Sequence, residues 1–253
     1  MSTLSEIQGR KIFFLYPATV IQNRVIEELT QQELEVYIVK DHIAIKKALH
    51  KYPNSIVFAD INEKMNEAEW ETWIRGIMRA QPDVLIGIVT SNRDENLMRK
   101  YINSVKIHCG YTMLRSDLNK TIVQIFEALK TVNAKGRRKY IRACIERETT
   151  ATINLMQGNS FINGVIRDIS VVGISCTFEQ DPGLTKNALF KDIQIKLQSM
   201  LLKVEAIIFG SRTDYGAKTY VMLFTQRIDP EVRTKIRKYI QHNLQSKMDL
   251  ELK

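Results

Sequence analysis

Three arginines stand close together in the segment "RRKYIRA", residues 137–143, and together they offer binding chemistry for an anion. Arg138 and Arg142 are four residues apart, and Arg137 precedes them directly. A guanidinium donates hydrogen bonds in a planar fork, pairs with phosphate or with the O6 and N7 edge of guanine, and stacks on aromatic rings. The segment is therefore a solvated basic linker, a nucleic-acid patch or a pocket for one small anion.

A second polar group follows Arg142 by 26 residues, in the string "RDISVVGIS". Asp168 and Ser170 are two residues apart, so in an extended strand both side chains project from the same face. Gly173 permits a tight backbone path that a side chain would obstruct. An acceptor, a hydroxyl and a glycine turn can together read the edge of a base.

The elements that position these groups follow from the pattern of residues 133–253. Short segments of β-like sequence are separated by turns such as Asp181-Pro182-Gly183, with almost no long helix between them. This pattern predicts a small antiparallel β-barrel. The stretch "DPEVRTKIRKYIQHNLQ" begins with Asp229 as a cap and has Pro230 in its first turn, which predicts a closing helix.

Residues 1–132 carry a different pattern. Five short apolar runs alternate with segments of helical periodicity, and the runs are "KIFFLYP", "EVYIVK", "SIVFADI", "VLIGIVT" and "CGYTML". Such alternation indicates βαβ units around a buried parallel sheet. The polar, basic string "NAKGRRK" separates the two halves. We therefore expect two domains, residues 1–132 and 133–253.

RxxxR followed by DxSxxG at the start of a small β-domain resembles the PilZ domain family, receptors for the bacterial second messenger cyclic di-GMP. The resemblance spans roughly residues 135–245, about the size of one domain. It implies a six-stranded barrel with a terminal helix, and cyclic di-GMP as ligand without a further cofactor. The matching residues, which the resemblance implies as the binding site, are Arg137, Arg138, Arg142, Asp168, Ser170 and Gly173.

The chemistry of this ligand agrees with the residue types. Cyclic di-GMP has two phosphates and two guanines, and arginine can pair with either group and also stack on a base. Asp168 can accept from guanine amino or imino hydrogens, and Ser170 adds a short hydrogen bond. We expect the arginine segment to close over the ligand against the barrel face and to order as it binds.

The first half resembles the receiver domain of two-component response regulators, a doubly wound five-stranded parallel sheet. Asp60 ends the third apolar run, where a receiver carries its phosphoacceptor, and Thr90 ends the fourth, where it carries a switch hydroxyl. The acidic residues that bind Mg²⁺ after the first strand of a receiver are replaced by Tyr16-Pro17-Ala18. In place of the lysine after the fifth strand, Arg115 offers the nearest cation.

Phosphoryl transfer without a positioned metal ion loses its main charge stabilisation. We therefore expect a pseudo-receiver that contacts an unidentified protein, and we interpret Asp60 as a helix cap or loop carboxylate rather than as a phosphoacceptor. Trp70 and Trp73, three residues apart, are typical of a helix core, although one of them could be exposed to the partner. By the resemblance to the PilZ family, Gly210 and Arg212 lie near the end of a strand that can approach the ligand. We favour a turn in "FGSRTDYG" and leave both residues outside the expected binding site.

Composition excludes several classes of protein. The chain of 253 residues has no apolar run near the roughly 20 residues of a membrane span, and its start is polar, so we expect a cytoplasmic protein without membrane insertion. Cys109, Cys144 and Cys176 form no CxxC pair and are expected to be buried and reduced, and the four histidines have no metal-ligand spacing. Nothing resembles a catalytic triad, P-loop or metal-hydrolase motif, so we expect no enzyme.

The net charge of +9 leaves two alternative functions open. Residues 131–253 carry 20 Lys/Arg against 12 Asp/Glu, so this half is expected to meet an anionic partner. Nucleic-acid binding is one alternative, although the basic helix with Arg233, Lys235, Arg237 and Lys238 is more typical of a closing helix with a solvated face. A phosphorelay regulator phosphorylated at Asp60 is the other.

Overall fold

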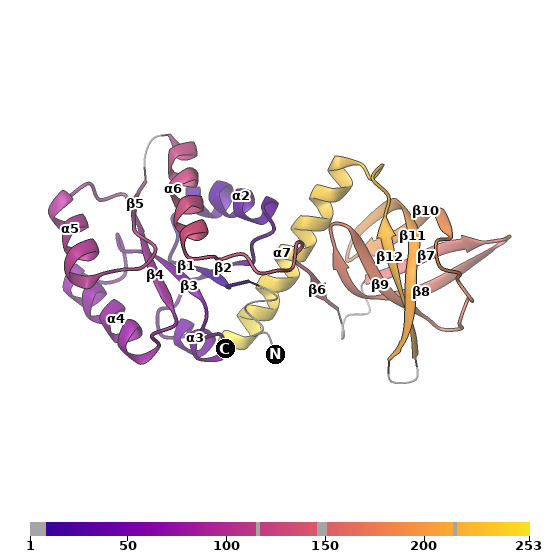
Figure 1. Ribbon diagram of the computed structural model, residues 1–253, viewed down its shortest axis with the longest axis horizontal. Helices are drawn as coiled ribbons and strands as arrows, with labels where there is room; N and C mark the ends of the chain where they lie inside the picture. Colours follow the sequence, from indigo (N-terminus) through magenta and orange to yellow (C-terminus); the bar gives the residue numbers. More distant parts are fainter. Residues whose placement is uncertain (1–8, 115–116, 146–150, 215–216) are drawn as a thin grey trace. The chain divides into compact units, whose positions relative to one another are not determined.

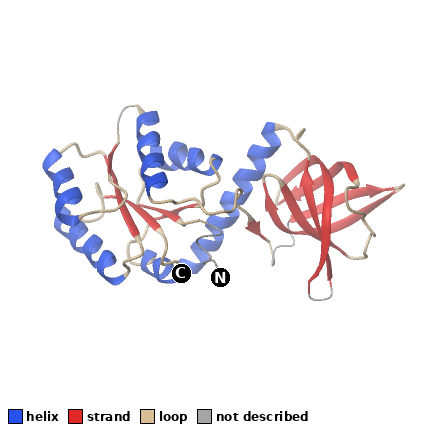
Figure 2. Cartoon of the chain, in the orientation of Figure 1, coloured by secondary structure: helices blue, strands red, loops and turns tan. Residues whose placement is uncertain are grey.

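The computed structural model describes residues 9–114, 117–145, 151–214 and 217–253. The chain divides into two compact units, the first formed by Met1–Lys139 and Leu244–Lys253 and the second by Tyr140–Asn243. The first unit contains most of the helices and the second most of the strands (Figure 2). The second unit is thus an insertion near the end of the first. The last ten residues, which the sequence pattern groups with the second domain, pack with the first unit.

A parallel sheet of five strands forms the centre of the first unit (Figure 1). Its order is β2-β1-β3-β4-β5, which is the doubly wound order of flavodoxin-like folds. The strands are β1 (Ile12–Leu15), β2 (Val36–Val39), β3 (Ile56–Asp60), β4 (Leu85–Thr90) and β5 (Tyr111–Met113). Each strand lies within one of the five apolar runs, so the prediction of a receiver-like sheet is confirmed.

Helices cover both faces of this sheet, because alternate residues of a strand point to opposite sides. Phe13 and Leu15 contribute to one buried cluster, and Ile12 and Phe14 to another. The helical segments are η1 (Ile21–Val25), α2 (Ile26–Gln31), α3 (Ile45–Lys51), α4 (Glu67–Ala80), α5 (Glu95–Arg99), η2 (Lys100–Val105) and α6 (Leu118–Thr131). Residues of α3 and α4 pack into the first cluster, and residues of α2 and α6 into the second.

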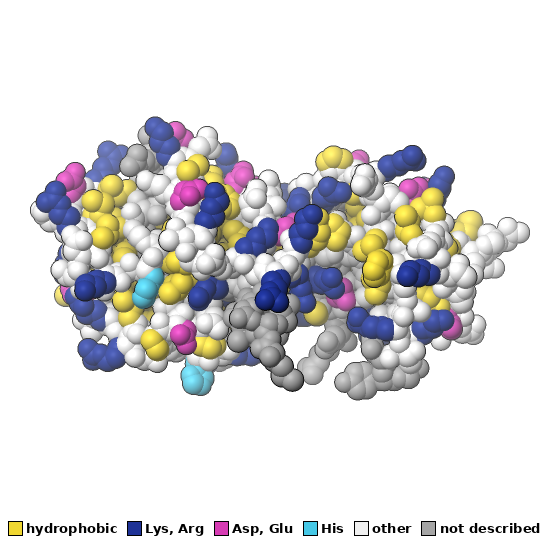
Figure 3. All heavy atoms as spheres, viewed as in Figure 1, with side chains coloured by type: hydrophobic (Ala, Val, Ile, Leu, Met, Phe, Trp, Pro, Cys, Tyr) yellow, Lys and Arg dark blue, Asp and Glu magenta, His cyan; other side chains and the backbone are white. Residues whose placement is uncertain are grey.

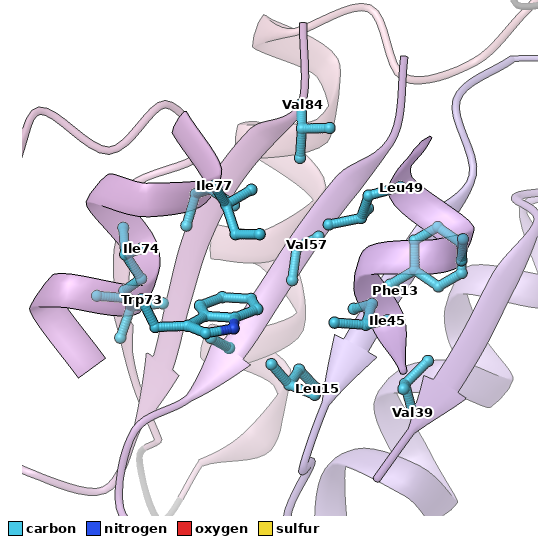
Figure 4. Close-up of a cluster of buried hydrophobic side chains, with 14 of the residues drawn as sticks. Phe13, Leu15, Val39, Ile45, Leu49, Val57, Trp73, Ile74, Ile77 and Val84 are labelled. Carbon is cyan, nitrogen blue, oxygen red and sulfur yellow. The ribbon is translucent and has the colours of Figure 1, made fainter. Parts of the chain in front are cut away.

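Figure 4 shows the first cluster, in which Trp73 and Ile77 of α4 lie over Val57 of β3. Both tryptophans of α4 are buried, Trp70 completely and Trp73 to 8% exposure. The indole nitrogen of Trp70 donates to the backbone oxygen of Glu63 at 3.1 Å, and that of Trp73 donates to the oxygen of His42 at 3.0 Å. The prediction of a helix core is confirmed, and the idea that one tryptophan is exposed to a partner is wrong.

The second unit is a closed antiparallel barrel of six strands with one further strand outside the ring. The ring runs β8-β7-β10-β11-β12-β9 and closes through pairing of β8 with β9. In the described part of the chain, β6 pairs with β8 and lies outside the ring. This confirms the predicted six-stranded barrel. The strands are β6 (Ala143–Cys144), β7 (Ala151–Gln157), β8 (Ser160–Ser170), β9 (Gly173–Phe178), β10 (Leu189–Leu197), β11 (Met200–Asp214) and β12 (Ala217–Phe224).

The terminal helix α7 (Pro230–Leu252) begins as the sequence predicts. Asp229 accepts a hydrogen bond from the backbone nitrogen of Glu231 at 2.7 Å, and Pro230 occupies the first helical position. Ile236 and Ile240 are fully buried, which agrees with a closing helix. The helix then continues past Asn243 into residues that belong to the first unit.

The cysteines separate into two kinds. Cys109 and Cys176 are buried, and burial raises the pKa of each thiol to about 12. The expectation that Cys144 is buried is wrong: β6 lies outside the ring, and its alternation turns Ala143 inward and Cys144 outward. Among the helices that the structure describes, none has a stretch long and apolar enough to cross a bilayer.

Candidate functional site

The serine of the DxSxxG motif holds a two-residue turn between β8 and β9. Ser170 lies opposite Gly173 in the ladder, with Val171 and Val172 between them. The Ser170 hydroxyl donates to the backbone oxygen of Gly173 at 3.2 Å and accepts from the nitrogen of Val172 at 3.4 Å. Ser170 is 4% exposed, so its hydroxyl is used inside the turn.

Gly173 is required by the close approach of a neighbouring strand. A Cβ atom at this position would lie 2.3 Å from the backbone oxygen of Met222 and 3.2 Å from Cα of Leu223, both on β12. Gly173 pairs with Leu223 in the ladder that joins β9 to β12. The glycine therefore lets β12 pack against the turn, in agreement with the tight backbone path expected from the sequence.

Asp168 lies where the two motifs meet. Its Oδ1 is 3.9 Å from Nη1 of Arg142, and its Oδ2 accepts a hydrogen bond from the hydroxyl of Ser175. The Arg142 side chain is 50% exposed and that of Asp168 is 21% exposed. A separation of 3.9 Å is an ion pair without a hydrogen bond, so the fork of Arg142 is not committed to Asp168.

Strand β6 brings Arg142 to this position. Cys144 pairs with Asp168 and Ala143 with Ile169, and the nitrogen of Ile145 donates to the oxygen of Arg167 at 2.7 Å. Arg142 immediately precedes this short ladder. The second arginine of RxxxR is therefore held beside the aspartate of DxSxxG by backbone pairing.

Ser175 is a site residue that motif reasoning missed. It lies opposite Asp168 in the ladder between β8 and β9, is 2% exposed, and donates to the Asp168 carboxylate. A signal was available in the sequence, because a two-residue turn after Ser170 places position 175 opposite position 168. This hydrogen bond holds the Asp168 side chain through Oδ2, while Oδ1 lies 3.9 Å from Arg142.

The same cross-strand row continues to Gly210. Ser175 pairs with Val221, and Val221 pairs with Gly210 beside a bulge in β11. A Cβ at Gly210 would meet no atom within 4 Å, so the row ends in open space. The interpretation of Gly210 and Arg212 as a turn is wrong, because both residues lie within β11, where the long ladder with β12 continues past the bulge.

Arg137 and Arg138 lie in the connector at the end of the first unit. The connector is fixed to that unit just before them, because the nitrogen of Arg10 donates to the oxygen of Ala134 at 2.8 Å and Nζ of Lys135 donates to the oxygen of Gln32 at 2.9 Å. Arg137 is exposed and Arg138 is partly buried. The structure thus brings Arg142 together with the DxSxxG residues, whereas the other two arginines precede the division between the units.

Residues 136–242 match the family model described as PilZ domain. This region is a PilZ domain. The match contains both motifs, begins at the end of the connector and covers the second unit up to residue 242, so the resemblance predicted from the motifs is confirmed. No curated protein matched the chain.

Among solved structures, the PilZ domain with c-di-GMP of YcgR from Escherichia coli is similar at 16% identity, over 41% of this chain and 88% of that one, with a TM-score of 0.36. The Inhibitor of motility of Bacillus subtilis shares 14% identity over 42% of this chain and 50% of its own, with a TM-score of 0.37. The signal receiver domain of an HD domain-containing protein from Pseudomonas fluorescens Pf-5 shares 18% identity over 53% and 94%, with a TM-score of 0.42. The chain spans about half of the Bacillus protein.

The unit that the PilZ domain interrupts has a depression of about 560 Å³ at the carboxyl ends of its strands. Asp60 lies there at the end of β3 and is 6% exposed. Its Oδ1 accepts from the backbone nitrogen of Asn62 at 3.1 Å and from the Asn62 side chain. Asp60 is thus the last residue of β3, and its carboxylate holds the following loop through Asn62. The interpretation as a helix cap is wrong, because Asn66 caps α4.

Asn62 links Asp60 to the end of the neighbouring strand. Its Oδ1 accepts from the hydroxyl of Thr90 at 2.6 Å and from the nitrogen of Ser91 at 3.2 Å. The Thr90 hydroxyl is therefore occupied within the protein. Among the described residues, no group of three His, Cys, Asp or Glu side chains could hold a metal ion, and Arg115 lies outside the described residues.

The environment of Asp60 opposes its charge. Burial raises the pKa of this carboxyl above its ordinary value, although hydrogen bonds from Asn62 and Ala18 act in the opposite direction. Between the ordinary pKa and the raised one, the folded protein binds more protons than the unfolded chain, so the free energy of unfolding falls as pH rises. At neutral pH the ionised Asp60 therefore costs stability.

We predict that Gly173→Ala destabilises the PilZ domain by about 1–3 kcal/mol, because the new methyl group would overlap the backbone of β12. Urea unfolding followed by circular dichroism measures the change. Gly210→Ala is the matched control, since a Cβ there meets nothing within 4 Å. Equal urea midpoints for the two variants would contradict the role given to the β12 contact.

We also predict that Asp60→Asn raises the melting temperature at pH 7, because the amide keeps an oxygen acceptor for Asn62 and removes the buried charge. The gain should shrink as pH falls through the raised pKa of Asp60 and should disappear below its ordinary value of 3.8. Thermal unfolding at a series of pH values tests this. Asp83→Asn, at an exposed position, is the control, and a gain that does not vary with pH would count against the explanation.

Proposed function

We propose that this chain is a non-enzymatic signalling effector that binds cyclic di-GMP through its PilZ domain. The observation that carries the proposal is the meeting of the two motifs, in which Nη1 of Arg142 lies 3.9 Å from Oδ1 of Asp168. A half-exposed guanidinium beside a partly exposed carboxylate presents donors and acceptors to a ligand. This combination suits a guanine nucleotide, which has phosphates and an edge with both acceptors and donors.

In this proposal the site residues have different roles. Arg138 and Arg142 bind phosphate or the O6 and N7 edge of guanine, and Arg137 adds a third cation. Asp168 accepts from the guanine amino and imino hydrogens, oriented by Ser175. Ser170 and Gly173 hold the turn that positions Asp168, since the Ser170 hydroxyl is already used within that turn.

Ligand binding then changes the arrangement of the two units. Arg137 and Arg138 precede the division of the units and Arg142 follows it, so closing all three on one ligand constrains the connector between them. The receiver-like unit is the part that meets an unidentified protein partner. Its carboxylate Asp60 is buried and hydrogen-bonded by Asn62, which supports a scaffold rather than a phosphorylation site.

On the face of the molecule shown in Figure 3, the placement of basic residues suits a compact ligand better than a nucleic acid. Figure 3 shows Lys and Arg side chains spread over the visible surface of both units, interspersed with acidic and apolar groups. A protein that tracks a nucleic-acid backbone has instead a continuous basic stripe. In α7, Lys235 is paired with Glu231 at 2.7 Å, as on a solvated helix face.

The first test is titration calorimetry of the full chain with cyclic di-GMP. We expect binding by the unaltered protein and a loss of affinity of about 10- to 100-fold for each of Arg138→Ala, Arg142→Ala and Asp168→Ala, because each change removes a charge-assisted hydrogen bond. Replacing Arg75 by Ala is the control, since this arginine lies on α4 and pairs with Glu71. Absence of binding by the unaltered protein would falsify the proposal.

The second test concerns Asp60. Incubation with acetyl phosphate and Mg²⁺, followed by intact-mass measurement, should yield no phosphorylated protein, because Asp60 is buried and hydrogen-bonded by Asn62, and among the described residues no group of three acidic, His or Cys side chains could hold the metal. A genuine receiver domain treated in parallel shows that the reagent is active. A mass increase of one phosphoryl group that is lost in Asp60→Asn would instead support the phosphorelay alternative.

A further inference from the structure

A β-bulge in β8 turns the side chain of Arg167 to the same face as that of Asp168. The ladder between β8 and β9 shifts register between Ile166 and Asp168, so Arg167 is the extra residue. Neighbouring side chains of a regular strand point to opposite faces, whereas a bulge re-aims one of them. Ile166 and Ile169 are fully buried, while Arg167 is exposed and Asp168 is partly exposed. Arg167 and Asp168 therefore share the face of β8 opposite to these isoleucines.

Two hydrogen bonds hold Arg167 in this position. Its backbone oxygen accepts from the nitrogen of Ile145 at 2.7 Å, and its side-chain Nε donates to the hydroxyl of Thr177 at 3.0 Å. Thr177 lies two residues beyond Ser175 on β9, so both of these side chains point to one face. Because Ser175 donates to Asp168, the guanidinium of Arg167 is held on the same face as the carboxylate, beside the next residue of β9 on that face.

The two guanidiniums approach Asp168 from opposite ends of β8. Arg142 precedes β6, which runs antiparallel to β8, so it comes from the end of β8. Thr177 pairs with Val165, so the guanidinium of Arg167 lies toward the start of β8. All of these residues belong to the second unit. The carboxylate is therefore flanked by two cations within one domain.

The guanidinium of Arg167 keeps hydrogen-bond donors for a ligand. Its Nε–H is used on Thr177, and the N–H groups of its two terminal nitrogens remain. Within the described ranges of the chain, no Asp or Glu forms an ion pair with this arginine. The terminal nitrogens can therefore form the planar fork with which arginine binds an oxyanion.

The chemistry of a guanine nucleotide assigns different partners to the two arginines. In guanine the O6 acceptor lies next to the N1–H donor, so a cation beside the carboxylate that accepts from N1 can reach O6. Arg142, whose Nη1 is 3.9 Å from Oδ1 of Asp168, suits that acceptor. The phosphate is attached through the sugar, away from this edge of the base, and the guanidinium of Arg167 is held away from the carboxylate by Thr177. A phosphate oxygen is the matching group for its fork.

Resting on the proposed function, we propose that Arg167 is a further ligand-binding residue, which pairs with a phosphate group of cyclic di-GMP. The bulge thus gives the PilZ domain a cation whose position is set by β6 and β9 and not by the connector. Because its backbone and its Nε are already hydrogen-bonded, this side chain loses little conformational freedom when the ligand binds. The residue before the DxSxxG motif extends the site along β8 and β9.

The test is titration calorimetry of the full chain with cyclic di-GMP, in which the unaltered protein is compared with Arg167→Gln. We expect the affinity of the variant to be about 10-fold lower, because it lacks a charge-assisted hydrogen bond to phosphate. Arg167→Lys keeps the charge without the fork and should have an intermediate affinity. Arg227→Gln is the matched control, since it removes the same charge from an exposed position in the turn after β12, and it should bind like the unaltered protein.

Two further measurements separate ligand contact from a structural role. Thr177→Val removes the hydrogen bond that holds Nε but leaves the guanidinium, so it should weaken binding less than Arg167→Gln does. Added salt should weaken binding by the unaltered chain more than binding by Arg167→Gln, because salt screens the interaction that this variant lacks. Equal affinities for Thr177→Val and Arg167→Gln, with the salt dependence of the unaltered chain, would mean that Arg167 only holds β9 and would overturn the proposal.

The outcomes also separate this proposal from the proposed function. If the unaltered chain does not bind cyclic di-GMP, both fail. If it binds, but Arg167→Gln binds equally well or Arg227→Gln loses as much affinity, the role of Arg167 is overturned and the proposed function stands. Should Arg167→Gln not fold, as judged by thermal unfolding, Arg167→Lys is measured in the same way, and an affinity equal to that of the unaltered chain would then overturn the proposal.

Discussion

The two-residue turn between β8 and β9 is the constraint on which the barrel and its candidate site both depend. Pairing of Ser170 with Gly173 sets Asp168 opposite Ser175, and the missing Cβ of Gly173 lets β12 approach and close the ring. Side chains alternate between the two faces of a strand, so a slip of one residue would turn Asp168 away from Arg142. The DxSxxG motif, which we associate with ligand binding, therefore also sets the register between β8 and β9.

Strand β8 is long enough to pair with two strands, one after the other, along the same edge. β7 pairs with its residues up to Val165, and β6 pairs with Asp168 and Ile169 in the DxSxxG motif. By pairing with β8, the short strand β6 places Arg142, at the end of the basic connector, beside Asp168. The two ends of the connector before β6 are therefore held by different units. Ala134 is hydrogen-bonded to the first unit, and Arg142 is positioned by the pairing of β6 in the second.

Local pattern was sufficient for much of this molecule and insufficient at defined places. The pattern of apolar residues predicts both sheets, because burial of one or both faces of a strand fixes which positions must be apolar. The spacing of Trp70 and Trp73 on α4 likewise predicts that both are buried. Gly210 was misread because a bulge lets β11 continue through a sequence typical of turns. The contact of Gln245 with Ile38 joins residues 207 positions apart, and no local periodicity records such a pair.

In the receiver-like unit, the carboxylate of Asp60 is buried although the acidic residues that bind Mg²⁺ in a receiver are replaced by Tyr16-Pro17-Ala18. Burial makes the Asp60 carboxylate costly at neutral pH, and Asn62 offsets part of that cost by donating to it. Through its oxygen, Asn62 also ties the end of β3 to Thr90 and Ser91 at the end of β4. These bonds stabilise the loops in one arrangement and occupy the groups that would otherwise meet a phosphoryl group. The edge strand β2 of the same unit is satisfied in a different way, by the side-chain amide of Gln245, which bonds to both backbone groups of Ile38.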